Sequence, residues 1–573
     1  MRHEPPAAEP TVVGINRTQD GSVAIARPSG AYSLQKERLT RRKHHWGRLG
    51  DLPKLYVPAM PDLREPVDLV VECFSSDDEI KRIDSYHDEL RETLQFRAEP
   101  RIVTISHHLS HLYSAFPPSP FDAAAGMIID AQGSPVRDFT ETCGFGEETP
   151  PDMLEVSSFY RCERGRQPEC IAKQLWDGDW EHPAGLGCFY YLLTRVMFTG
   201  EGSEGKAMGL APFGRAGADG GRFGLPDLVV DGHRVLIPRE WLDLFADKER
   251  FSHFVDGSGS FEDAADLAAE GQRAFETALL KVTAWLHEQT GTENLVFAGG
   301  TALNCSANGR ILRESAFSDV FIPPSAHDGG TALGCAIYGL VECLGEESGF
   351  RWTNDFLGPE LETDAVEAAV RTAAEDAGLV VEEPGDDAAL AARAAELLDA
   401  GHVVAVHRGR SESGPRALGN RSIIGDARHP AMRDFINFRV KGREWFRPLA
   451  PLVLADHAPR IFDVDRPAPF MQLAIDVRPE HWDALPAITH VDGTARIQTV
   501  EPANTPFLHA LLSAFEARTG CPVLLNTSLN GKGDPLTETP ADSLACLTST
   551  EMHALVVGPY LVRKRDAAPV PRE

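Results

Sequence analysis

The sequence lacks long apolar segments. None of its hydrophobic runs approaches the ~20 residues that a membrane-spanning helix requires, and the opening MRHEPPAAEPTVVGIN contains no apolar core of a signal peptide. These two absences argue against a membrane protein and against secretion through a signal peptide. We therefore expect a folded, cytoplasmic protein that has no membrane partner.

Cysteine pairs with metal-binding or redox spacing are also lacking. The chain of 573 residues has ten cysteines, and they are scattered. Cys162 and Cys170, in CERGRQPEC, have neither CxxC spacing nor a second pair to match. For a chain of this length, the pattern predicts reduced, intracellular thiols.

Positive charge is scarce. The 56 Lys and Arg residues stand against 85 Asp and Glu residues, for a formal net charge of −29. This balance argues against general nucleic-acid binding, which depends on neutralising phosphates with Lys and Arg. Residues 401–450 reverse the sign, with ten basic and four acidic side chains. A basic segment in so acidic a chain predicts a site for a small, highly charged anion.

The length predicts two to four domains, and the first half shows signs of duplication. Residues 11–35 predict three short strands, with turns at 19–22 and 28–30. A similar phrase, AAAGMIIDAQGSPVRDF, begins at residue 123. The repeat indicates a duplicated α/β unit, as in actin-like and sugar-kinase-like proteins that enclose a nucleotide between two lobes.

Further elements follow along the chain. A helix is predicted over about 262–289, ending at a glycine cap. The next segment, NLVFAGGTALNCSANGRIL, predicts a strand, a Gly-Gly turn and a helix start. Its backbone amides either approach a nucleotide or only form a tight turn. Residues 344–360 have the composition of a linker, and a second α/β domain begins near 360.

Two histidines in HHLSHLYSAF, His107 and His111, share one face of a predicted helix because they are four residues apart. Alone they fit a metal-ligand pair and a polar helix face equally well. Asp130 and Asp328 each follow an apolar strand, and such strand ends converge on one crevice in α/β folds. Together the four side chains suit Fe(II), Mn or Zn. The alternative for each aspartate is to cap its own turn.

The basic segment interleaves its charges with Gly, Pro and aromatic residues, as in HRGRSESGPRALGNRSI and VKGREWFRPLAP. Arginine binds phosphate oxygens bidentately, and glycines let backbone N–H groups reach the same oxygens. This favours a phosphate site over the alternative, a solvated basic face. The basic residues of these segments and of the later TARIQTV are Arg408, Arg410, Arg416, Arg421, Lys441, Arg443, Arg447 and Arg496.

Several longer phrases are shared with a known family. They include ERLTRRKHH, HHLSHLYSAF, EGKAMGLAPFG, GGTALNCSANGRI, GPRALGNRSI, KGREWFRPLAP and FEARTGCPVLLNTSLNGKGDPLTETP. Through them the chain resembles the NodU/CmcH family of O-carbamoyltransferases, which includes the tobramycin, cephalosporin and ansamycin carbamoyltransferases. The resemblance spans residues 12 to 560.

The resemblance implies an α/β chain of two parts. Residues 1–350 would form a TsaD-like domain of the actin-like ATPase fold, with duplicated α/β lobes, and residues 351–573 a YrdC-like α/β domain. The YrdC-like domain would make carbamoyl-AMP from carbamoyl phosphate and ATP. The TsaD-like domain would then transfer the carbamoyl group to a hydroxyl of a small secondary metabolite.

Site residues are carried over by position in this sequence. The implied metal ligands are His107, His111, Asp130 and Asp328, with Fe(II) or another divalent metal. The implied carbamoyl phosphate and ATP site, with Mg²⁺ on ATP, holds Arg416, Lys441, Arg443, Arg447, Arg496, Ser528 and Asn530. In residues 1–350, the adenylate would contact Gly299, Gly300, Asn304 and Asp328. The implied catalytic residues are Lys43, His107, Asp130, Lys441 and Arg443.

Two positions depart from the family. Gln19 stands where a histidine is usual in the phrase QDGS, and glutamine cannot act as a general base. His108 is one candidate substitute. Ala131 replaces the usual glycine after Asp130. Both changes predict an acceptor geometry somewhat different from that of the aminoglycoside enzyme.

Other functions fit the sequence less well. Threonylcarbamoyl-adenylate chemistry on tRNA conflicts with the net charge, and a hydrogenase-maturation enzyme would carry CxxC zinc fingers. A sugar kinase leaves the basic segment without a role, and a non-catalytic nucleotide-binding protein is a further alternative. The Ala- and Arg-rich composition suits a GC-rich bacterial genome, so we expect a part in antibiotic biosynthesis. A homodimer is compatible with the sequence.

Overall fold

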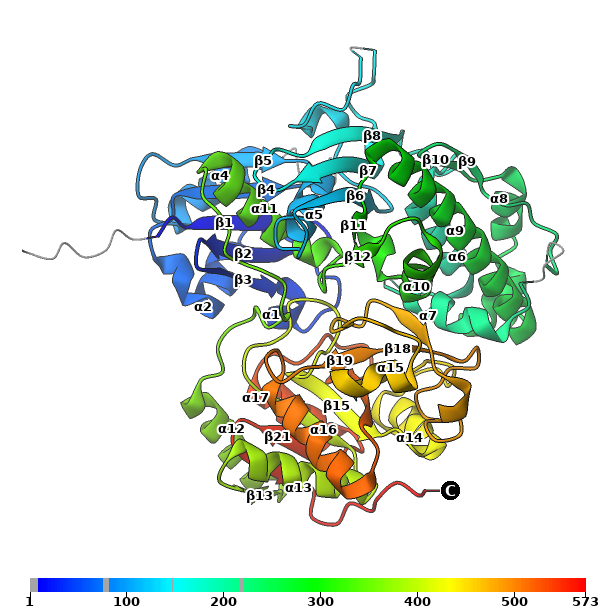
Figure 1. Cartoon of the computed structure of the whole chain (residues 1–573). Helices are drawn as coiled ribbons and strands as arrows, with labels where there is room; N and C mark the ends of the chain where they lie inside the picture. Colours follow the sequence, from blue (N-terminus) through cyan, green and yellow to red (C-terminus); the bar gives the residue numbers. More distant parts are fainter. Residues whose placement is uncertain (1–8, 76–81, 147, 201, 217–220, 573) are drawn as a thin grey trace, which may run out of the picture.

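The computed structural model describes residues 9–75, 82–146, 148–200, 202–216 and 221–572, which form a mixed α/β structure (Figure 1). Residues 1–8 lie outside this part, and with them lies half of the segment used to argue against a signal peptide. In the part that is described, no helix is both long and apolar enough to cross a membrane.

The chain begins with a five-stranded sheet in the order β3-β2-β1-β4-β5. The first three strands run antiparallel to one another, and β4 and β5 continue parallel to β1. The turns between the first three strands fall where the sequence predicts them. The strands are β1 (Val12–Asn16), β2 (Ser22–Arg27), β3 (Gly30–Gln35), β4 (Leu69–Cys73) and β5 (Ile102–Ile105).

A second five-stranded sheet repeats the first. Its order is β8-β7-β6-β11-β12, with β6, β7 and β8 antiparallel and with β11 and β12 parallel to β6. The same order and directions confirm the predicted duplication of an α/β unit. We call the two units the first and second lobes. The strands are β6 (Ala123–Ile129), β7 (Leu154–Glu163), β8 (Glu169–Trp176), β11 (Asn294–Ala298) and β12 (Asp319–Phe321), with a separate ribbon of β9 (Val229–Asp231) and β10 (Arg234–Leu236).

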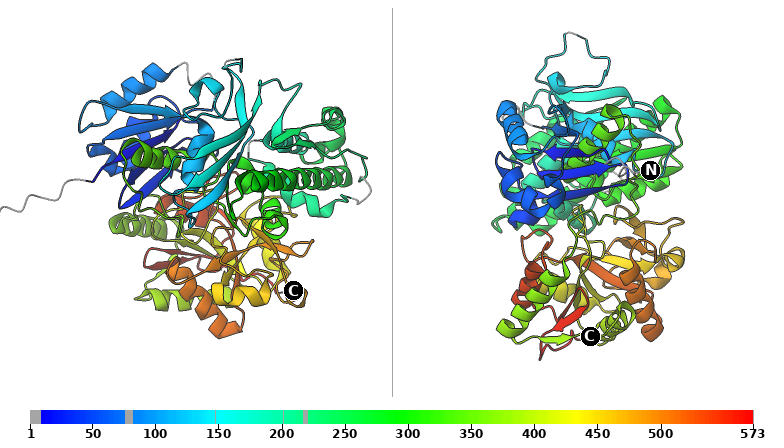
Figure 2. Two further views of the ribbon diagram at one scale, coloured as in Figure 1. Left: turned by 45° about the horizontal axis from the view of Figure 1, so that its top comes forward. Right: turned by 90° about the vertical axis from the view of Figure 1, so that its left-hand side faces the viewer.

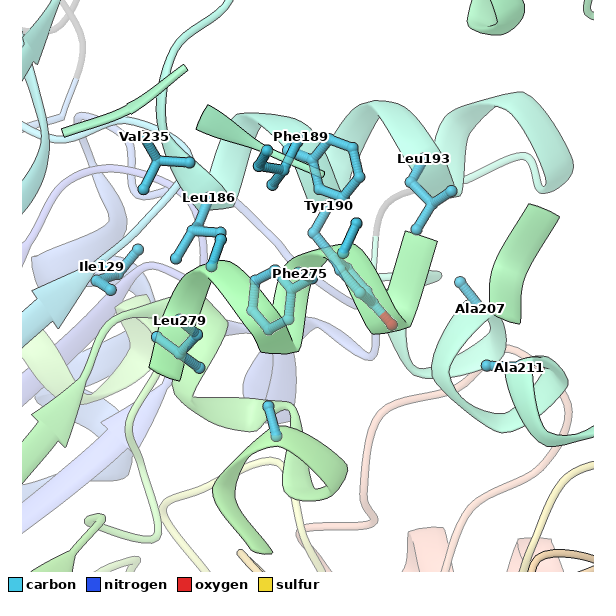
Figure 3. Close-up of a cluster of buried hydrophobic side chains, with 14 of the residues drawn as sticks. Ile129, Leu186, Phe189, Tyr190, Leu193, Ala207, Ala211, Val235, Phe275 and Leu279 are labelled. Carbon is cyan, nitrogen blue, oxygen red and sulfur yellow. The ribbon is translucent and has the colours of Figure 1, made fainter. Parts of the chain in front are cut away.

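Helices pack on these sheets and supply the core. Figure 3 shows one cluster, in which Phe189, Tyr190 and Leu193 of one helix lie over Phe275 and Leu279 of another. Burying each such side chain stabilises the fold by about 1.5–3 kcal/mol. The helices are α1 (Lys36–Thr40), α2 (Val57–Ala59), α4 (Ile83–Thr93), α5 (His107–Ala115), α6 (Gly185–Met197), α7 (Glu204–Leu210), α8 (Arg239–Ala246), α9 (Phe261–Thr290), α10 (Cys305–Glu314) and α11 (Thr331–Tyr338).

The long helix α9 confirms the prediction for 262–289. Ser260 caps its first turn, since the side-chain oxygen accepts a hydrogen bond from the Asp263 N–H. Gly291 ends it in the left-handed conformation, with φ 62°.

Helices α5 and α11 approach each other so closely that a glycine is required. A Cβ at Gly334 would lie 1.7 Å from the carbonyl oxygen of Ser110. We expect Gly334→Ala to lower the free energy of unfolding by about 2–3 kcal/mol, because α5 would have to shift. Gly205→Ala is the matched control, since a Cβ there meets nothing within 4 Å. Urea unfolding of both variants checks this, and an equal effect in the two would contradict the close-approach argument.

The second part of the chain forms one eight-stranded sheet, in the order β13-β22-β21-β14-β15-β20-β16-β19. The predicted order helix, strand, helix, strand after residue 360 is confirmed. The strands are β13 (Val380–Glu382), β14 (Val404–His407), β15 (Arg421–Asp426), β16 (Ala450–Leu454), β19 (Gln498–Val500), β20 (Val523–Ser528), β21 (Ala554–Val557) and β22 (Tyr560–Arg563), with a separate pair of β17 (Ala474–Asp476) and β18 (Thr494–Arg496). The helices are α12 (Thr363–Ala377), α13 (Asp387–Asp399), α14 (Pro430–Phe435), α15 (Ala458–Ile461), α16 (Pro506–Thr519) and α17 (Pro540–Ser549).

The second part lies against the two lobes, as the views of Figure 2 show. Direct hydrogen bonds join them. Arg38 donates to the Gly414 carbonyl at 2.6 Å, and Arg41 donates to the Pro535 carbonyl at 2.9 Å. Gln472 donates back to the Pro323 carbonyl at 2.9 Å. The first of these bonds holds the glycine-rich basic loop against α1 of the first lobe.

The expectation of reduced thiols is wrong for one pair. Cys143 and Cys170 form a disulfide, with Cα atoms 5.2 Å apart. The two residues are separated by 27 positions, so only the return of the chain onto β8 brings them together, and local spacing gives no sign of it. The other eight cysteines are free.

Candidate functional site

The two histidines of α5 meet at their Nε2 atoms, which are 3.1 Å apart. Helix α5 starts at His107 because the Ser106 side chain accepts the Leu109 N–H. The four-residue spacing then places His107 and His111 one turn apart on the same face. Both side chains are fully buried, so the alternative of a solvated polar helix face is wrong.

Asp130 and Asp328 complete the group, which we call the His-Asp cluster. Asp130 lies 3.4 Å from His111 and 3.9 Å from His107, while Asp328 lies 3.5 Å from His107 and 3.7 Å from His111. One ligand atom from each residue can be chosen so that all four lie within 4.8 Å of one another. Asp130 directly follows β6, and Asp328 lies in the segment after β12; β11 lies between these two strands in the sheet of the second lobe.

The charges within the cluster are those of a cation site. Burial lowers the pKa of His107, but the Asp328 carboxylate more than reverses this and raises it well above its usual value. The same contact holds the pKa of Asp328 far below its usual range against the effect of burial. Two imidazole Nε2 atoms and two carboxylates form the mixed N/O set that first-row divalent metals prefer. The residues therefore fit a divalent metal ion.

The Gly299–Asn304 turn supports this cluster. Gly299 has φ 91°, and a Cβ there would lie 2.3 Å from the Ile129 carbonyl oxygen. The Gly300 N–H donates to Asp130 at 3.0 Å. Asn304 caps α10 by accepting the Ala307 N–H at 3.1 Å. Contact of Gly299, Gly300 and Asn304 with an adenylate stays a prediction.

Three residues were considered in connection with the general base and the acceptor pocket: His108, Gln19 and Ala131. The His108 Nδ1 lies 2.7 Å from the Ser158 hydroxyl, and burial together with the charge of Lys173 puts the pKa of His108 well below its usual value. Gln19 contributes its backbone carbonyl, which accepts from Asn16 at 2.9 Å. Ala131 donates its N–H to Asp130 at 2.8 Å.

In the second part, Lys441 is buried and surrounded by oxygen atoms. Its Nζ donates to the Ser528 carbonyl at 2.7 Å, to the Ser528 hydroxyl at 3.1 Å and to the Asn530 side-chain oxygen. Thus the end of β20 holds the ammonium in one place. Burial first, and then the nearby Arg443 guanidinium, put the pKa of Lys441 well below its usual value.

Four arginines join Lys441 in what we call the basic cluster. Burial lowers the pKa of each one, to about 9 for Arg416 and for Arg443, and repulsion from neighbouring arginines adds to this for Arg416, Arg443 and Arg447. Among the residues that the structure describes, the buried Arg416 Nε has no hydrogen-bond partner. Positively charged side chains held close together, with N–H groups that no protein acceptor uses, are typical of an anion-binding site. The four are Arg416, Arg443, Arg447 and Arg496.

Other basic residues of the segment have different roles. Arg421 is fully buried and donates to backbone carbonyls, including those of Arg408 and Gly409. It thereby fixes the glycine-rich loop. Arg408 pairs with Asp387 at 2.8 Å, and Arg410 pairs with Glu360 at 3.1 Å. None of these three belongs to the basic cluster.

Lys43 links the two parts of the chain electrostatically. Burial lowers its pKa; Glu37 opposes this, and Arg447 and Arg443 of the basic cluster add to it. Its ammonium therefore lies in the field of the second part, although the residue follows α1 of the first lobe. Sequence reasoning assigned Lys43 to the transfer site and missed this proximity. It also missed Asn16, whose side chain donates to the Asp328 carbonyl at 3.0 Å and whose place at the end of β1 was the available signal.

Because the cations of the basic cluster repel one another, removing one of them should stabilise the free protein but weaken its stabilisation by an anion. We expect Arg416→Gln to raise the melting temperature of the free protein by about 1–3 °C, because one like charge is removed. Pyrophosphate at 100 times its dissociation constant should stabilise the unaltered protein by about 2.7 kcal/mol. The variant should lose most of that gain.

Differential scanning fluorimetry with and without pyrophosphate measures both effects. Arg408→Gln is the matched control, since Arg408 already has an acidic partner. An unchanged pyrophosphate response in Arg416→Gln would contradict the assignment of the basic cluster as an anion site.

Comparisons with known proteins identify the family of the chain. Residues 76–337 match the model described as the carbamoyltransferase N-terminus, and residues 395–564 match that of the C-terminus. The chain is 34% identical to nodulation protein NolO of Bradyrhizobium diazoefficiens, over 81% of this chain and 80% of that one. It is 32% identical to 3'-hydroxymethylcephem-O-carbamoyltransferase of Streptomyces clavuligerus, over 82% of each chain.

Among solved structures, HypF of T. kodakarensis is similar over 59% of this chain and 48% of its own, with 14% identity and a TM-score of 0.38. The sequence matches establish that this chain belongs to the carbamoyltransferase family and is a transferase.

Proposed function

We propose that the chain is an ATP-dependent O-carbamoyltransferase that works in two half-reactions. The main support for this proposal is the basic cluster, because its buried and half-buried positive charges are not balanced by acidic partners. Glu444, the acid nearest Arg447 at 3.8 Å, already pairs with Lys206 at 3.1 Å. We assign residues 351–573 as a YrdC-like domain that forms carbamoyl-AMP, and residues 1–350 as a TsaD-like domain of the actin-like fold that transfers the carbamoyl group.

In the first half-reaction, carbamoyl phosphate and ATP, with its Mg²⁺, would occupy the basic cluster. The Lys441 ammonium and the Arg443 guanidinium bind phosphate oxygens, while Arg416, Arg447 and Arg496 offset the charge that develops on the departing pyrophosphate. Ser528 and Asn530 keep Lys441 in position. Water first cleaves carbamoyl phosphate to carbamate and inorganic phosphate. A carbamate oxygen then attacks the α-phosphorus of ATP, the bond from that phosphorus to the β-phosphate oxygen breaks, and pyrophosphate leaves.

In the second half-reaction, the adenylate would lie between Lys43 and the His-Asp cluster. His107, His111, Asp130 and Asp328 would hold Fe(II) or another divalent ion, which supplies Lewis-acid polarisation of a carbonyl or phosphate oxygen. The N–H of Gly300 keeps Asp130 oriented. Because carbamoyl-AMP reacts with water, two sites in one chain favour delivery over hydrolysis.

The acceptor would be a hydroxyl of a small molecule. One relative is named for a hydroxymethylcephem and another for nodulation, which supports a secondary metabolite, including an antibiotic or its sugar. A threonylcarbamoyl-adenylate enzyme is the alternative, and use of threonine and bicarbonate in place of carbamoyl phosphate would favour it.

Pyrophosphate release by the purified protein, without an acceptor, tests the proposal. ATP alone should give a background rate, and addition of carbamoyl phosphate should raise it at least about tenfold, with one inorganic phosphate per pyrophosphate. A rate of pyrophosphate release that does not change when carbamoyl phosphate is added would contradict the adenylation step.

A further inference from the structure

A histidine outside the predicted site pairs with an aspartate beside the His-Asp cluster. The His44 Nδ1 lies 2.9 Å from the Asp20 Oδ1. The Asp20 carboxylate is nearly buried, whereas a quarter of the His44 side chain is exposed. Both residues have φ 51°, a backbone conformation that non-glycine residues rarely adopt and that gathers at functional sites.

A glycine makes room for the second ring nitrogen of His44. Gly202 has φ 70°, and a Cβ there would lie 2.1 Å from the His44 Nε2. Within the described residues, Nε2 has no hydrogen-bond partner. A donor that is held by its other nitrogen and left free at this one is placed to meet a ligand.

The position of Asp20 in the fold connects the pair to the His-Asp cluster. Asp20 follows β1 in the hairpin of the first lobe, as Asp130 follows β6 in the hairpin of the second lobe. The Asn16 side chain donates to the carbonyls of Asp20, at 3.3 Å, and of Asp328, at 3.0 Å. The strand end that holds Asp20 is thereby tied to a residue of the cluster.

The charge around His44 is that of an imidazolium. Burial lowers its pKa, but Asp20 and then Glu37 outweigh burial and raise the pKa to about 9. Glu204 of the second lobe also lies in its field. With Lys43, the next residue, His44 supplies positive charge to a region otherwise lined by carboxylates.

We propose that His44, held as a cation by Asp20, binds the phosphate of the adenylate during carbamoyl transfer. This rests on the proposed function. The acceptor oxygen bonds to the carbamoyl carbon, the bond from that carbon to the phosphate oxygen breaks, and the electron pair goes to the phosphate. The His44 N–H donates to that oxygen as AMP leaves, and the hydroxyl proton passes to water. His44 is thus a catalytic residue, one to which the sequence analysis gave no role although the phrase ERLTRRKHH contains it.

AMP binding to the full chain tests this by calorimetry. All variants are made in an Arg443→Ala background, so that binding at the basic cluster is weakened. His44→Gln should weaken AMP binding at least about tenfold, the effect of one lost charge-assisted hydrogen bond. His44→Lys should stay within about threefold of the parent because it keeps the charge. His45→Gln is the matched control and should bind as the parent does.

Two results overturn the proposal. One is His44→Gln binding AMP as tightly as the parent does, with melting temperatures equal. The other is His44→Lys binding as weakly as His44→Gln, which would make His44 a structural support. Pyrophosphate release by the unaltered chain reports on the proposed function separately, since it needs no acceptor and is measured without any change at His44.

Discussion

Lys441→Ala should abolish pyrophosphate release that depends on carbamoyl phosphate, with a loss of about 10³-fold or more. The oxygens of Ser528 and Asn530 fix the Lys441 ammonium, so its charge is in place before the substrates bind. Preorganised cations of this kind supply several kcal/mol of transition-state stabilisation. Alanine removes the charge and leaves the oxygen atoms around it without a donor.

Arg439→Ala is the control for Lys441→Ala. Arg439 lies two residues away, is 62% exposed at its side chain and pairs with Glu551. Its removal should change the rate less than twofold. If Lys441→Ala retained more than a tenth of the rate while Arg439→Ala behaved normally, adenylation at the basic cluster would be contradicted.

The second large effect concerns metal. We expect His111→Ala to lower the metal content of the purified protein from about one divalent ion per chain to below about 0.1. His111 is within 3.7 Å of both aspartates, so its loss removes one of four ligands. Loss of a supporting group around a metal site costs 10–100-fold in affinity, and loss of a ligand costs more.

Elemental analysis after dialysis against a chelator measures this content. His182→Ala is the control because His182 is exposed and pairs with Asp179 away from the cluster. Carbamoyl transfer should fail in His111→Ala while its unfolding curve stays cooperative. A metal content equal to that of the control would show that the His-Asp cluster is not the metal site.

Patterns in the sequence predicted those features that local rules determine. The strands of residues 11–35 and the helix α9 follow from periodicity and caps. The His-Asp cluster could be predicted because helix spacing fixes His107 against His111 and because strand ends converge in α/β folds. No packing detail was needed for either.

Features that depend on long-range packing were missed. Arg421 and Arg416 look alike in the sequence, yet Arg421 donates to backbone carbonyls, whereas Arg416 lies among like charges. The pairs Cys143–Cys170 and Asp20–His44 likewise join residues of different segments. The proximity of Lys43 to Arg447 depends on how the two parts of the chain meet, which no local pattern encodes.

The fate of ATP tests the central claim most directly. The protein is incubated with radiolabelled ATP, carbamoyl phosphate, Mg²⁺ and iron, without an acceptor, and the nucleotide products are separated and identified by mass. The account predicts carbamoyl-AMP and AMP, formed only when carbamoyl phosphate is present. ADP as the product would contradict it, because cleavage at the γ-phosphate is the chemistry of a kinase rather than of adenylation.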